Sequence, residues 1–244
     1  MTINLTYYHV ASDVPENNSE IAVVIDVLRA TTTISWALTN GADSIEVFSD
    51  LDLLKEKAMT WAPDKRLMLA ERGGKKLDGF DLGNSPLTVT KNIVKGKRLF
   101  MSTTNGTKAL QRVQNSQYLF PMALTNRKAV ADRIISLNKS NILILGSGWE
   151  GNYSLEDSLA AGALADYLIR FHNSEVNIVN DELNAALALW NFWKGDVLKC
   201  LKTATHGQRL SNIGNYEDDF KCCSQIDCLN IVPTQVERGV IRAS

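Results

Sequence analysis

The chain has 244 residues, of which 45% are hydrophobic and 22% are charged, and its formal net charge is -1. This composition is typical of a globular protein. It lacks the basic excess with which duplex-binding proteins neutralise phosphates, so no nucleic-acid partner is expected. No apolar run approaches the roughly 20 residues that span a bilayer, and the N-terminus lacks the basic start of an export signal, so we expect a cytoplasmic protein with no membrane partner. The cysteines Cys200, Cys222, Cys223 and Cys228 contain no C-x-x-C pair, which excludes a zinc ribbon.

Strand and helix patterns alternate through the first half of the chain. Residues 1–8 alternate apolar and polar side chains like a first strand, and the continuous β-branched run at 21–25 predicts a strand that is buried on both faces. The spacing of apolar residues then predicts, in order, a helix over 31–38, a strand over 44–48, a helix over 50–61 and a strand over 67–70. The glycine-rich stretch 75–86 is predicted to be irregular and too polar to enter the core.

The same alternation continues through the second half. The patterns predict strands over 97–101, 118–124, 141–145 and 229–232, and helices over 108–113, 126–138, 155–172 and 181–201. Alternating strands and helices are typical of a layered α/β domain with a largely parallel sheet. Because the sequence shows no internal repeat and no long linker, a single domain over 1–244 is the economical interpretation.

Four polar loops follow predicted strands directly. Ligands of open α/β sheets bind outside the carboxyl ends of the strands, so these loops are expected to converge. The first loop holds Asp26, which is well placed at a strand end to bind a metal ion, and Arg29, which can grip phosphate with two donors. Thr31 and Thr32 offer hydroxyls and amides at a helix start, where the dipole favours an anion. An ordinary N-cap beside a surface arginine is the alternative interpretation.

The second loop is Glu71-Arg72-Gly73-Gly74, in which the paired glycines would let the backbone approach a ligand closely. A plain turn beside a surface ion pair explains this loop equally well. Its extension over 79–86 ends in Asn84-Ser85-Pro86. Turn chemistry accounts for the glycines and the proline of this extension, but it does not account for the apolar Phe80 among them.

The third loop, over 102–107, carries hydrogen-bonding side chains at five of its six positions. After a strand and before a helix, it suits a phosphate-binding loop made of hydroxyls and amides. It is not a Walker loop, because the lysine of that pattern has no counterpart. An Asn-Gly hairpin is the alternative, but the residues that follow, from Lys108, favour a helix.

The fourth loop, over 146–157, is rich in glycine and ends in two adjacent acids, Glu156 and Asp157. Ser154 and Asp157 have the spacing of a capping box, which explains Asp157 but leaves Glu156 unexplained. Hard oxygen ligands of this kind suit Mg²⁺, which usually shares the phosphate oxygens of its substrate. His206 is either structural or a proton-transfer group.

Taken in order, five blocks of this sequence resemble the 2-phosphosulfolactate phosphatase family; the blocks are 23–33, 71–74, 79–86, 103–107 and 154–157. Their order and spacing agree from about residue 20 to 170, and His206-Gly207-Gln208 also looks familiar. The resemblance implies a three-layer α/β/α sandwich with a largely parallel or mixed central sheet. It further implies a Mg²⁺-dependent acid phosphatase acting on small phosphorylated 2-hydroxy acids. The name reaction converts 2-phospho-3-sulfolactate to 3-sulfolactate and phosphate on the route to coenzyme M.

The four polar loops and the family resemblance together lead to the hypothesis of metal-assisted hydrolysis. Asp26, Glu156 and Asp157 would bind Mg²⁺. Glu71 would be a further ligand or a base, and Arg72 would clamp the substrate carboxylate. The expected phosphate-binding residues are Arg29, Thr31, Thr32, Asn84, Ser85, Thr103, Thr104, Asn105, Gly106 and Thr107.

Two other functions and one question of assembly stay open at this point. A non-catalytic sensor or carrier of phosphorylated metabolites is the alternative function, and phosphoryl transfer to an acceptor other than water is a third. The aromatic segment 190–193 fits either core packing or a homo-oligomer interface.

Overall fold

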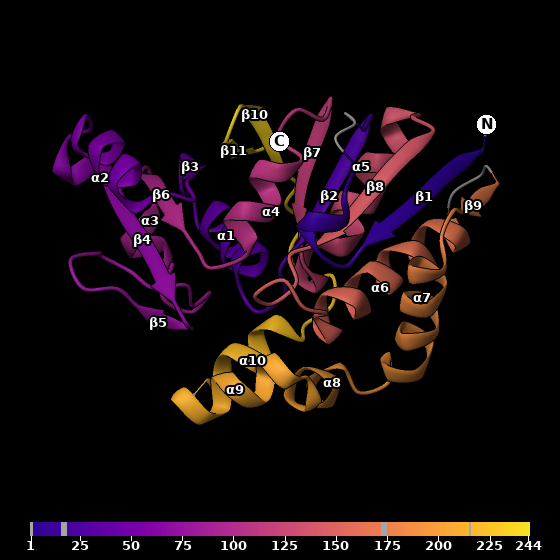
Figure 1. Cartoon of the computed structure of the whole chain (residues 1–244). Helices are drawn as coiled ribbons and strands as arrows, with labels where there is room; N and C mark the ends of the chain where they lie inside the picture. The colour runs from indigo at the N-terminus through magenta and orange to yellow at the C-terminus, as the bar shows by residue number, and fades with distance from the viewer. Residues whose placement is uncertain (1, 16–18, 172–174, 215) are drawn as a thin grey trace.

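The computed structural model of the chain describes residues 2–15, 19–171, 175–214 and 216–244. It is an α/β protein, as the alternating patterns predict, and its strands divide between two sheets where one central sheet was expected (Figure 1). Within the described ranges, no helix is both long and apolar enough to cross a bilayer.

The first sheet has five parallel strands in the order β7-β2-β8-β1-β9. Their bounds are Ile3–Tyr8 (β1), Ile21–Ile25 (β2), Tyr118–Met122 (β7), Asn141–Gly146 (β8) and Val176–Ile178 (β9). Every residue of β2 is buried, as the unbroken apolar run predicts, because the strand packs on both faces. Ile25 pairs in register with Met122 and Gly146, so the chain leaves β2, β7 and β8 at the same edge of the sheet.

The second sheet is mixed and has six strands in the order β10-β11-β3-β6-β4-β5. Their bounds are Ser44–Val47 (β3), Arg66–Arg72 (β4), Lys75–Lys76 (β5), Arg98–Ser102 (β6), Pro233–Glu237 (β10) and Val240–Ala243 (β11). β3, β6 and β4 run parallel to one another, whereas β5 and β11 pair antiparallel at the two sides of this group. The carboxyl ends of β4 and β6 therefore also lie together at one edge.

Helices separate and cover the two sheets (Figure 1). One hydrophobic cluster joins Val24 of the first sheet, Ile34 of α1, Leu110 of α4 and Leu99 of the second sheet, so α1 and α4 lie between the sheets. α5, α6 and α7 pack on the opposite face of the first sheet, and α2 packs on the far face of the second. The bounds are Ala30–Thr39 (α1), Leu51–Met59 (α2), Lys91–Val94 (α3), Gly106–Arg112 (α4), Arg127–Leu137 (α5), Leu155–Phe171 (α6) and Asp181–Trp193 (α7).

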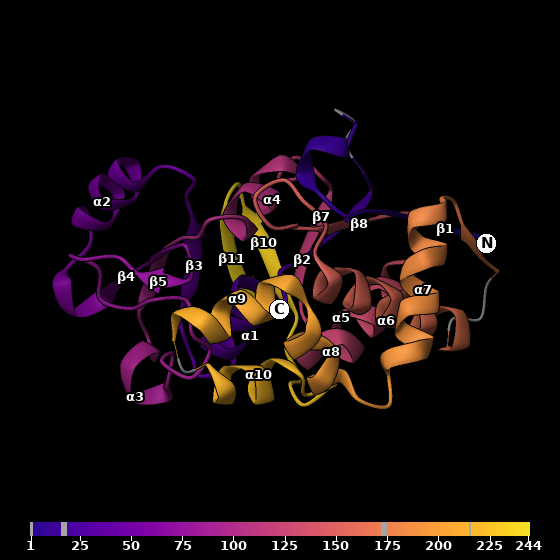
Figure 2. The ribbon, with the colours of Figure 1, turned by 60° about the horizontal axis from the view of Figure 1, so that its bottom comes forward.

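The C-terminal helices depart most from the sequence prediction. The single helix expected over 181–201 is two helices, α7 and α8 (Val197–Thr203). The helical conformation is interrupted at Gly195. Asp196 then caps α8, because its side chain accepts a hydrogen bond from the Lys199 amide. α9 (Thr205–Ile213) and α10 (Glu217–Cys223) follow, and the sequence patterns predict neither. Figure 2 shows α9 and α10 lying in front of α1, between the two sheets.

Two smaller differences concern single segments, and one predicted helix end is not described. Residues 229–232 do not form a strand; the tail instead forms the β10–β11 hairpin, with Gly239 at φ 74° in its turn. Phe80 is 5% exposed and packs with Leu54 and Phe100, so the stretch 75–86 does contribute to the core. The helix expected over 155–172 is described to Phe171, and His172 lies outside the described residues.

Candidate active site

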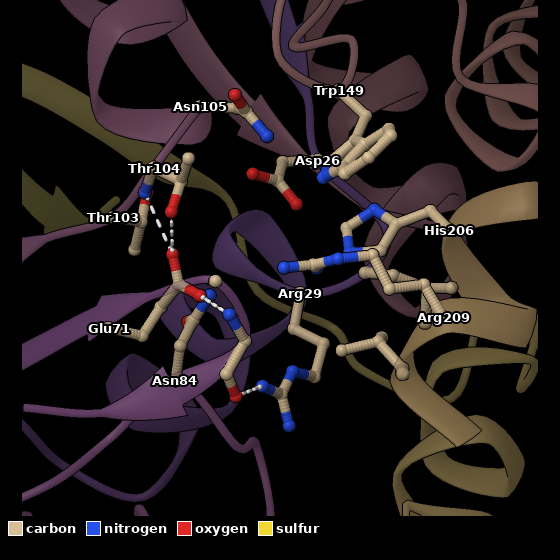
Figure 3. A pocket seen from close by; sticks show the side chains of 14 residues that line it. Asp26, Arg29, Glu71, Asn84, Thr103, Thr104, Asn105, Trp149, His206 and Arg209 are labelled. Carbon is tan, nitrogen blue, oxygen red and sulfur yellow. Dashed lines mark hydrogen bonds between the residues drawn. The ribbon is translucent and has the colours of Figure 1, made fainter. Parts of the chain in front are cut away.

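The chain segments at the carboxyl ends of β2, β4, β6 and β8 meet between the two sheets, and α9 closes the space from another side (Figure 3). They surround one pocket. Its lining residues are Asp26, Leu28, Arg29, Glu71, Gly73, Gly74, Asn84, Thr103, Thr104, Asn105, Trp149, His206, Arg209 and Leu210. The strand-end loops therefore converge as their positions predict, although they come from two sheets.

Asp26 follows β2 directly, lines the pocket and is 7% exposed. Its Oδ1 accepts a hydrogen bond from the Ala30 amide at 3.0 Å, where α1 begins. Its Oδ2 lies so close to Gly106 that a Cβ at that position would be 2.4 Å away, so the glycine makes room for the carboxylate. Burial, and to a lesser degree the carboxylates of Glu71 and Glu156, raise the pKa of Asp26 to about 6.

Glu71 ties two walls of the pocket together. Its Oε1 accepts from both the amide and the hydroxyl of Thr104, at 2.8 and 2.6 Å. Its Oε2 accepts from the Gly74 amide at 2.6 Å. With three donors on one carboxylate, Glu71 fixes the positions of the β6–α4 loop and of the turn after β4.

Thr103, Thr104 and Asn105 of the β6–α4 loop line the pocket. Thr103 and Thr107 bond each other reciprocally: the Thr107 amide donates to the Thr103 hydroxyl, and the Thr107 hydroxyl donates to the Thr103 carbonyl. α4 therefore begins at Gly106, two residues earlier than predicted, and Thr107 is buried in the helix start instead of facing a ligand. Asn105 lines the pocket and accepts the Glu150 amide at 3.2 Å, which links this loop to the β8–α6 loop.

Asn84 lines the pocket and is distinguished by its side-chain oxygen. It is 6% exposed, and within the part of the chain that the structure describes its Oδ1 has no hydrogen-bond donor. A buried acceptor without a donor is unfavourable, so this oxygen fits a site that a ligand completes.

Arg29 is committed to protein partners. Its guanidinium forms a buried ion pair with Asp219 of α10, donates to the Gly74 carbonyl at 3.0 Å and lies over the Tyr216 ring. Ser85, another expected phosphate ligand, donates its hydroxyl to the same Asp219 at 2.6 Å. Arg29 borders the pocket, but its charge is neutralised within the protein, so it does not supply the free phosphate grip that the sequence predicts.

Three further expected ligands do not reach the pocket. Thr31 donates to the carbonyls of Asp26 and Met122, and Thr32 donates to that of Val27; both threonines are fully buried. They are absent from the lining because short hydroxyl side chains on a buried helix satisfy nearby carbonyls first.

Arg72 is the third of these residues. It follows Glu71 on β4, and successive side chains of a strand point to opposite faces. Its guanidinium donates to the Glu71 carbonyl and to the Ser102 hydroxyl, and it does not line the pocket. The structure thus does not bring Arg72 to a substrate carboxylate.

Glu156 and Asp157 lie behind the pocket at the start of α6. Both oxygens of Asp157 are engaged, since Oδ1 accepts the Val27 amide and Oδ2 accepts the Ser147 hydroxyl, each at 2.9 Å. Burial, and then the charge of Glu156, raise the pKa of Asp157 well above its ordinary value. Glu156 is 2% exposed, and its Oε1 lies 3.3 Å from Nδ1 of His206.

Of the three acids expected to bind magnesium, only one lines the pocket. Among the described residues, no three acidic, histidine or cysteine side chains are grouped to hold an ion. Asp26, Glu156 and Asp157 are near enough to perturb one another, but only Asp26 of the three faces the pocket. Among the lining residues, Asp26 and Glu71 carry carboxylates, and Asn84 carries an amide oxygen that has no donor within the described residues.

α9 contributes residues that the sequence analysis missed or left undecided. His206 lines the pocket, and Arg209 reaches in beside it with its guanidinium 5.1 Å from the centre of the Trp149 ring. α9 is held against the Gly73-Gly74 turn so tightly that a Cβ on Gly74 would lie 2.6 Å from Ile213. The paired glycines line the pocket, where the sequence suggests a ligand, and they also accommodate a helix. No local pattern marks Arg209, because only the docking of α9 brings it to the pocket.

A buried carboxylate, polar loops at strand ends and cationic side chains in one pocket define an α/β enzyme whose site suits a phosphate ester. A family model described as 2-phosphosulpholactate phosphatase matches residues 8–238. The chain therefore belongs to the 2-phosphosulfolactate phosphatase family, and it is a phosphoric monoester hydrolase. This membership decides between the enzyme and the alternative of a non-catalytic sensor in favour of the enzyme.

Relatives of similar length support the same assignment. A protein from one strain of Prochlorococcus marinus is 60% identical over 240 residues, which cover 98% of this chain and 99% of the relative. One of Synechococcus sp. (strain WH7803) is 54% identical over 246 residues, covering 99% of each chain. One of Gloeothece citriformis (strain PCC 7424) is 50% identical over 240 residues, covering 98% and 99%. Each is described as "Probable 2-phosphosulfolactate phosphatase".

Proposed function

We propose that this enzyme hydrolyses 2-phospho-3-sulfolactate, or a closely related phosphorylated 2-hydroxy acid, to the hydroxy acid and inorganic phosphate, with Mg²⁺ as its cofactor. The observation that carries the proposal is the convergence of Asp26, Asn84 and the β6–α4 loop on one pocket in a chain that belongs to this family. The names of the relatives support the same substrate. A place in coenzyme M synthesis would follow from this substrate, and it is part of the proposal.

The phosphate would lie against the β6–α4 loop. Thr104 and Asn105 border the pocket there, and α4 begins at the next residue, so the helix dipole favours an anion at this wall. Glu71 would hold this loop in place through its bonds to Thr104 without itself contacting the ester. Most of the rate enhancement in phosphoryl transfer comes from such positioning and from charge stabilisation.

His206 would move the proton that the leaving alkoxide needs. Its Nδ1 faces the buried Glu156 at 3.3 Å, which leaves Nε2 for the pocket that the imidazole lines. A carboxylate behind an imidazole fixes the ring's orientation and its tautomer, so Glu156 would act as a positioning residue.

The donor set fits Mg²⁺ in a limited form. Mg²⁺ is usually held by one or two protein oxygens together with waters and substrate phosphate oxygens, so a full cage of carboxylates is not required. Asp26 Oδ2 and the unpartnered Asn84 Oδ1 are the oxygens that would hold it. The ion would supply charge neutralisation for the phosphate beside the Asp26 carboxylate. The sequence suggests Glu156 and Asp157 as direct ligands, but here they would not contact the ion. Glu156 would orient His206, and Asp157 would hold the loop after β2 through the Val27 amide.

A phosphate-release screen tests the proposal. The substrates are 2-phosphosulfolactate, 2-phospholactate, phosphoglycolate and 3-phosphoglycerate, each assayed with Mg²⁺ and with a chelator. The proposal expects the highest kcat/KM for phosphosulfolactate or phospholactate, and a loss of activity with chelator that added Mg²⁺ restores. Equal rates with and without Mg²⁺ would remove the metal from the proposal, and no release from any of the four would contradict the substrate class.

A further inference from the structure

We propose that Arg209 binds the second acidic group of the substrate, so that the pocket selects phosphate esters that also carry a carboxylate or sulfonate. This inference rests on the proposed function and extends it by naming a specificity-determining residue on α9.

The first reason is the charge balance of the pocket. Two guanidinium groups line it, those of Arg29 and Arg209. Arg29 is neutralised by the buried carboxylate of Asp219. Arg209 has no carboxylate within 4.0 Å and no hydrogen-bond acceptor among the residues that the structure describes, so its charge is available to a ligand. A guanidinium in a partly enclosed site without a counter-ion favours the binding of an anion.

The second reason is that the protein holds Arg209 in place by contacts that leave its hydrogen-bond donors free. The guanidinium lies over the face of Trp149, which orients its plane without using an N–H group. On another side it abuts the turn after β4, where a Cβ on Gly73 would lie 3.2 Å from Nη2. Gly73 has φ 58° and Gly74 has φ 85°, a backbone conformation that keeps this turn narrow below α9. A fixed planar fork matches the two oxygens of a carboxylate or sulfonate.

The third reason is the place of Arg209 relative to the phosphate wall. Figure 3 shows Arg209 entering the pocket from the side of His206 and Trp149, with Thr104 and Asn105 on the facing wall. A small ester in this pocket would therefore present its phosphate to the β6–α4 loop and its second acid to Arg209. An ester of a neutral alcohol would leave this guanidinium without a partner.

The test compares two esters of nearly equal size, 2-phospholactate and 2-phospholactamide, which differ in the charge of one group. For the wild-type enzyme, kcat/KM for the acid should exceed that for the amide by about 10²-fold or more, because a site built for a charged group rejects an analogue without it. Arg209→Gln should remove most of this ratio, chiefly by raising KM for the acid, and should change kcat/KM for the amide less than about threefold. Arg209→Lys should retain part of the ratio, since the charge stays and the fork is lost.

Arg133→Gln is the matched control, because Arg133 is an exposed arginine on α5 and its loss changes the net charge equally. It should leave the ratio unchanged. Calorimetry with 3-sulfolactate, which carries no phosphate, adds a readout independent of turnover: wild type and Arg133→Gln should bind it, and Arg209→Gln should not.

The possible results separate this inference from the proposed function. A wild-type enzyme that hydrolyses both esters with similar kcat/KM overturns the role of Arg209 and leaves the phosphatase proposal standing. An equal loss on both esters in Arg209→Gln also overturns it, because the guanidinium would then serve the phosphate. If no ester is hydrolysed but 3-sulfolactate still binds through Arg209, the proposed reaction fails and the acid-binding role stands.

Discussion

Two regions of the chain build the pocket, and they differ in how their residues are placed. The strand-end segments 26–29, 71–74 and 103–106 carry polar side chains at positions that the parallel strands fix. The C-terminal helices α9 and α10 contribute His206, Arg209 and Asp219 through packing alone. The comparison shows that one wall of a site can be recognised from local patterns, while the facing wall depends on where helices dock.

The two regions are also joined, so neither wall is independent of the other. The Arg29–Asp219 ion pair connects the loop after β2 to α10, and Ser85 donates to the same carboxylate. The Gly73-Gly74 turn lies directly under α9. Substitutions at these contacts distinguish two groups of residues: those that act on the substrate and those that only hold the two walls together.

The largest effect is expected at Asp26. Asp26→Asn keeps the shape of the side chain but removes the charge that faces the pocket, so kcat/KM for the phosphate ester should fall on the order of 10²-fold or more. Phosphate release at saturating Mg²⁺ is the measurement. Asp52→Asn, on the exposed first turn of α2, is the control and should have wild-type activity. A rate within threefold of wild type for Asp26→Asn would remove this residue from the reaction.

The next effect concerns the contact between the two regions. Asp219→Asn leaves the Arg29 guanidinium buried without a counter-charge, and the free energy of unfolding should fall by about 3 kcal/mol. Its neighbour Asp218 is exposed and pairs with Lys221 at the surface, so Asp218→Asn should cost less than about 0.5 kcal/mol. Urea unfolding of both variants gives the two values. Equal stabilities would mean that the buried pair does not hold α10 to the strand-end wall.

The pH dependence of stability tests the environment of Asp26. The pKa of Asp26 is about 6 in the folded protein and exceeds the usual 3.8. The stability that the protonated Asp26 side chain contributes is therefore fully present below pH 3.8 and is lost as the pH rises through 6. In metal-free protein at pH 7.5, Asp26→Asn should therefore be more stable than wild type by about 3 kcal/mol. The difference should vanish near pH 3.5. Thermal unfolding with a chelator measures both points, and equal stabilities at pH 7.5 would contradict the burial of a charged Asp26.

The smallest effect is expected at the glycine turn under α9. An alanine at Gly74 meets both its positive φ and the side chain of Ile213 at 2.6 Å, so the free energy of unfolding should fall by about 2 kcal/mol. Gly79 has a similar φ of 79° but nothing within 4 Å, so Gly79→Ala measures the backbone strain alone, about 1 kcal/mol. Gly74→Ala should also raise KM several-fold, because α9 carries Arg209, whereas Gly79→Ala should not. Equal KM values would mean that the turn does not position α9.

The sequence predicts much of the fold and one wall of the site, for reasons that particular residues make clear. The buried run 21–25 can only be a strand packed on both faces, so Asp26 is found at its end and Gly106 in the loop facing it. The sequence does not reveal that the strands form two sheets, because register and pairing partners leave no local signal. Thr31 and Thr32 are misjudged because their hydroxyls bond nearby carbonyls once α1 is buried. Arg209 is missed because its role depends on long-range docking.

The account as a whole depends on one site shared by the strand-end loops and α9. A crystal structure with Mg²⁺, inorganic phosphate and 3-sulfolactate would test this most directly. The account predicts phosphate against Thr104 and Asn105 beside Asp26, with the acid groups of sulfolactate within hydrogen-bond distance of Arg209. Anions bound only outside this pocket, or a bound sulfolactate that leaves Arg209 untouched, would contradict it.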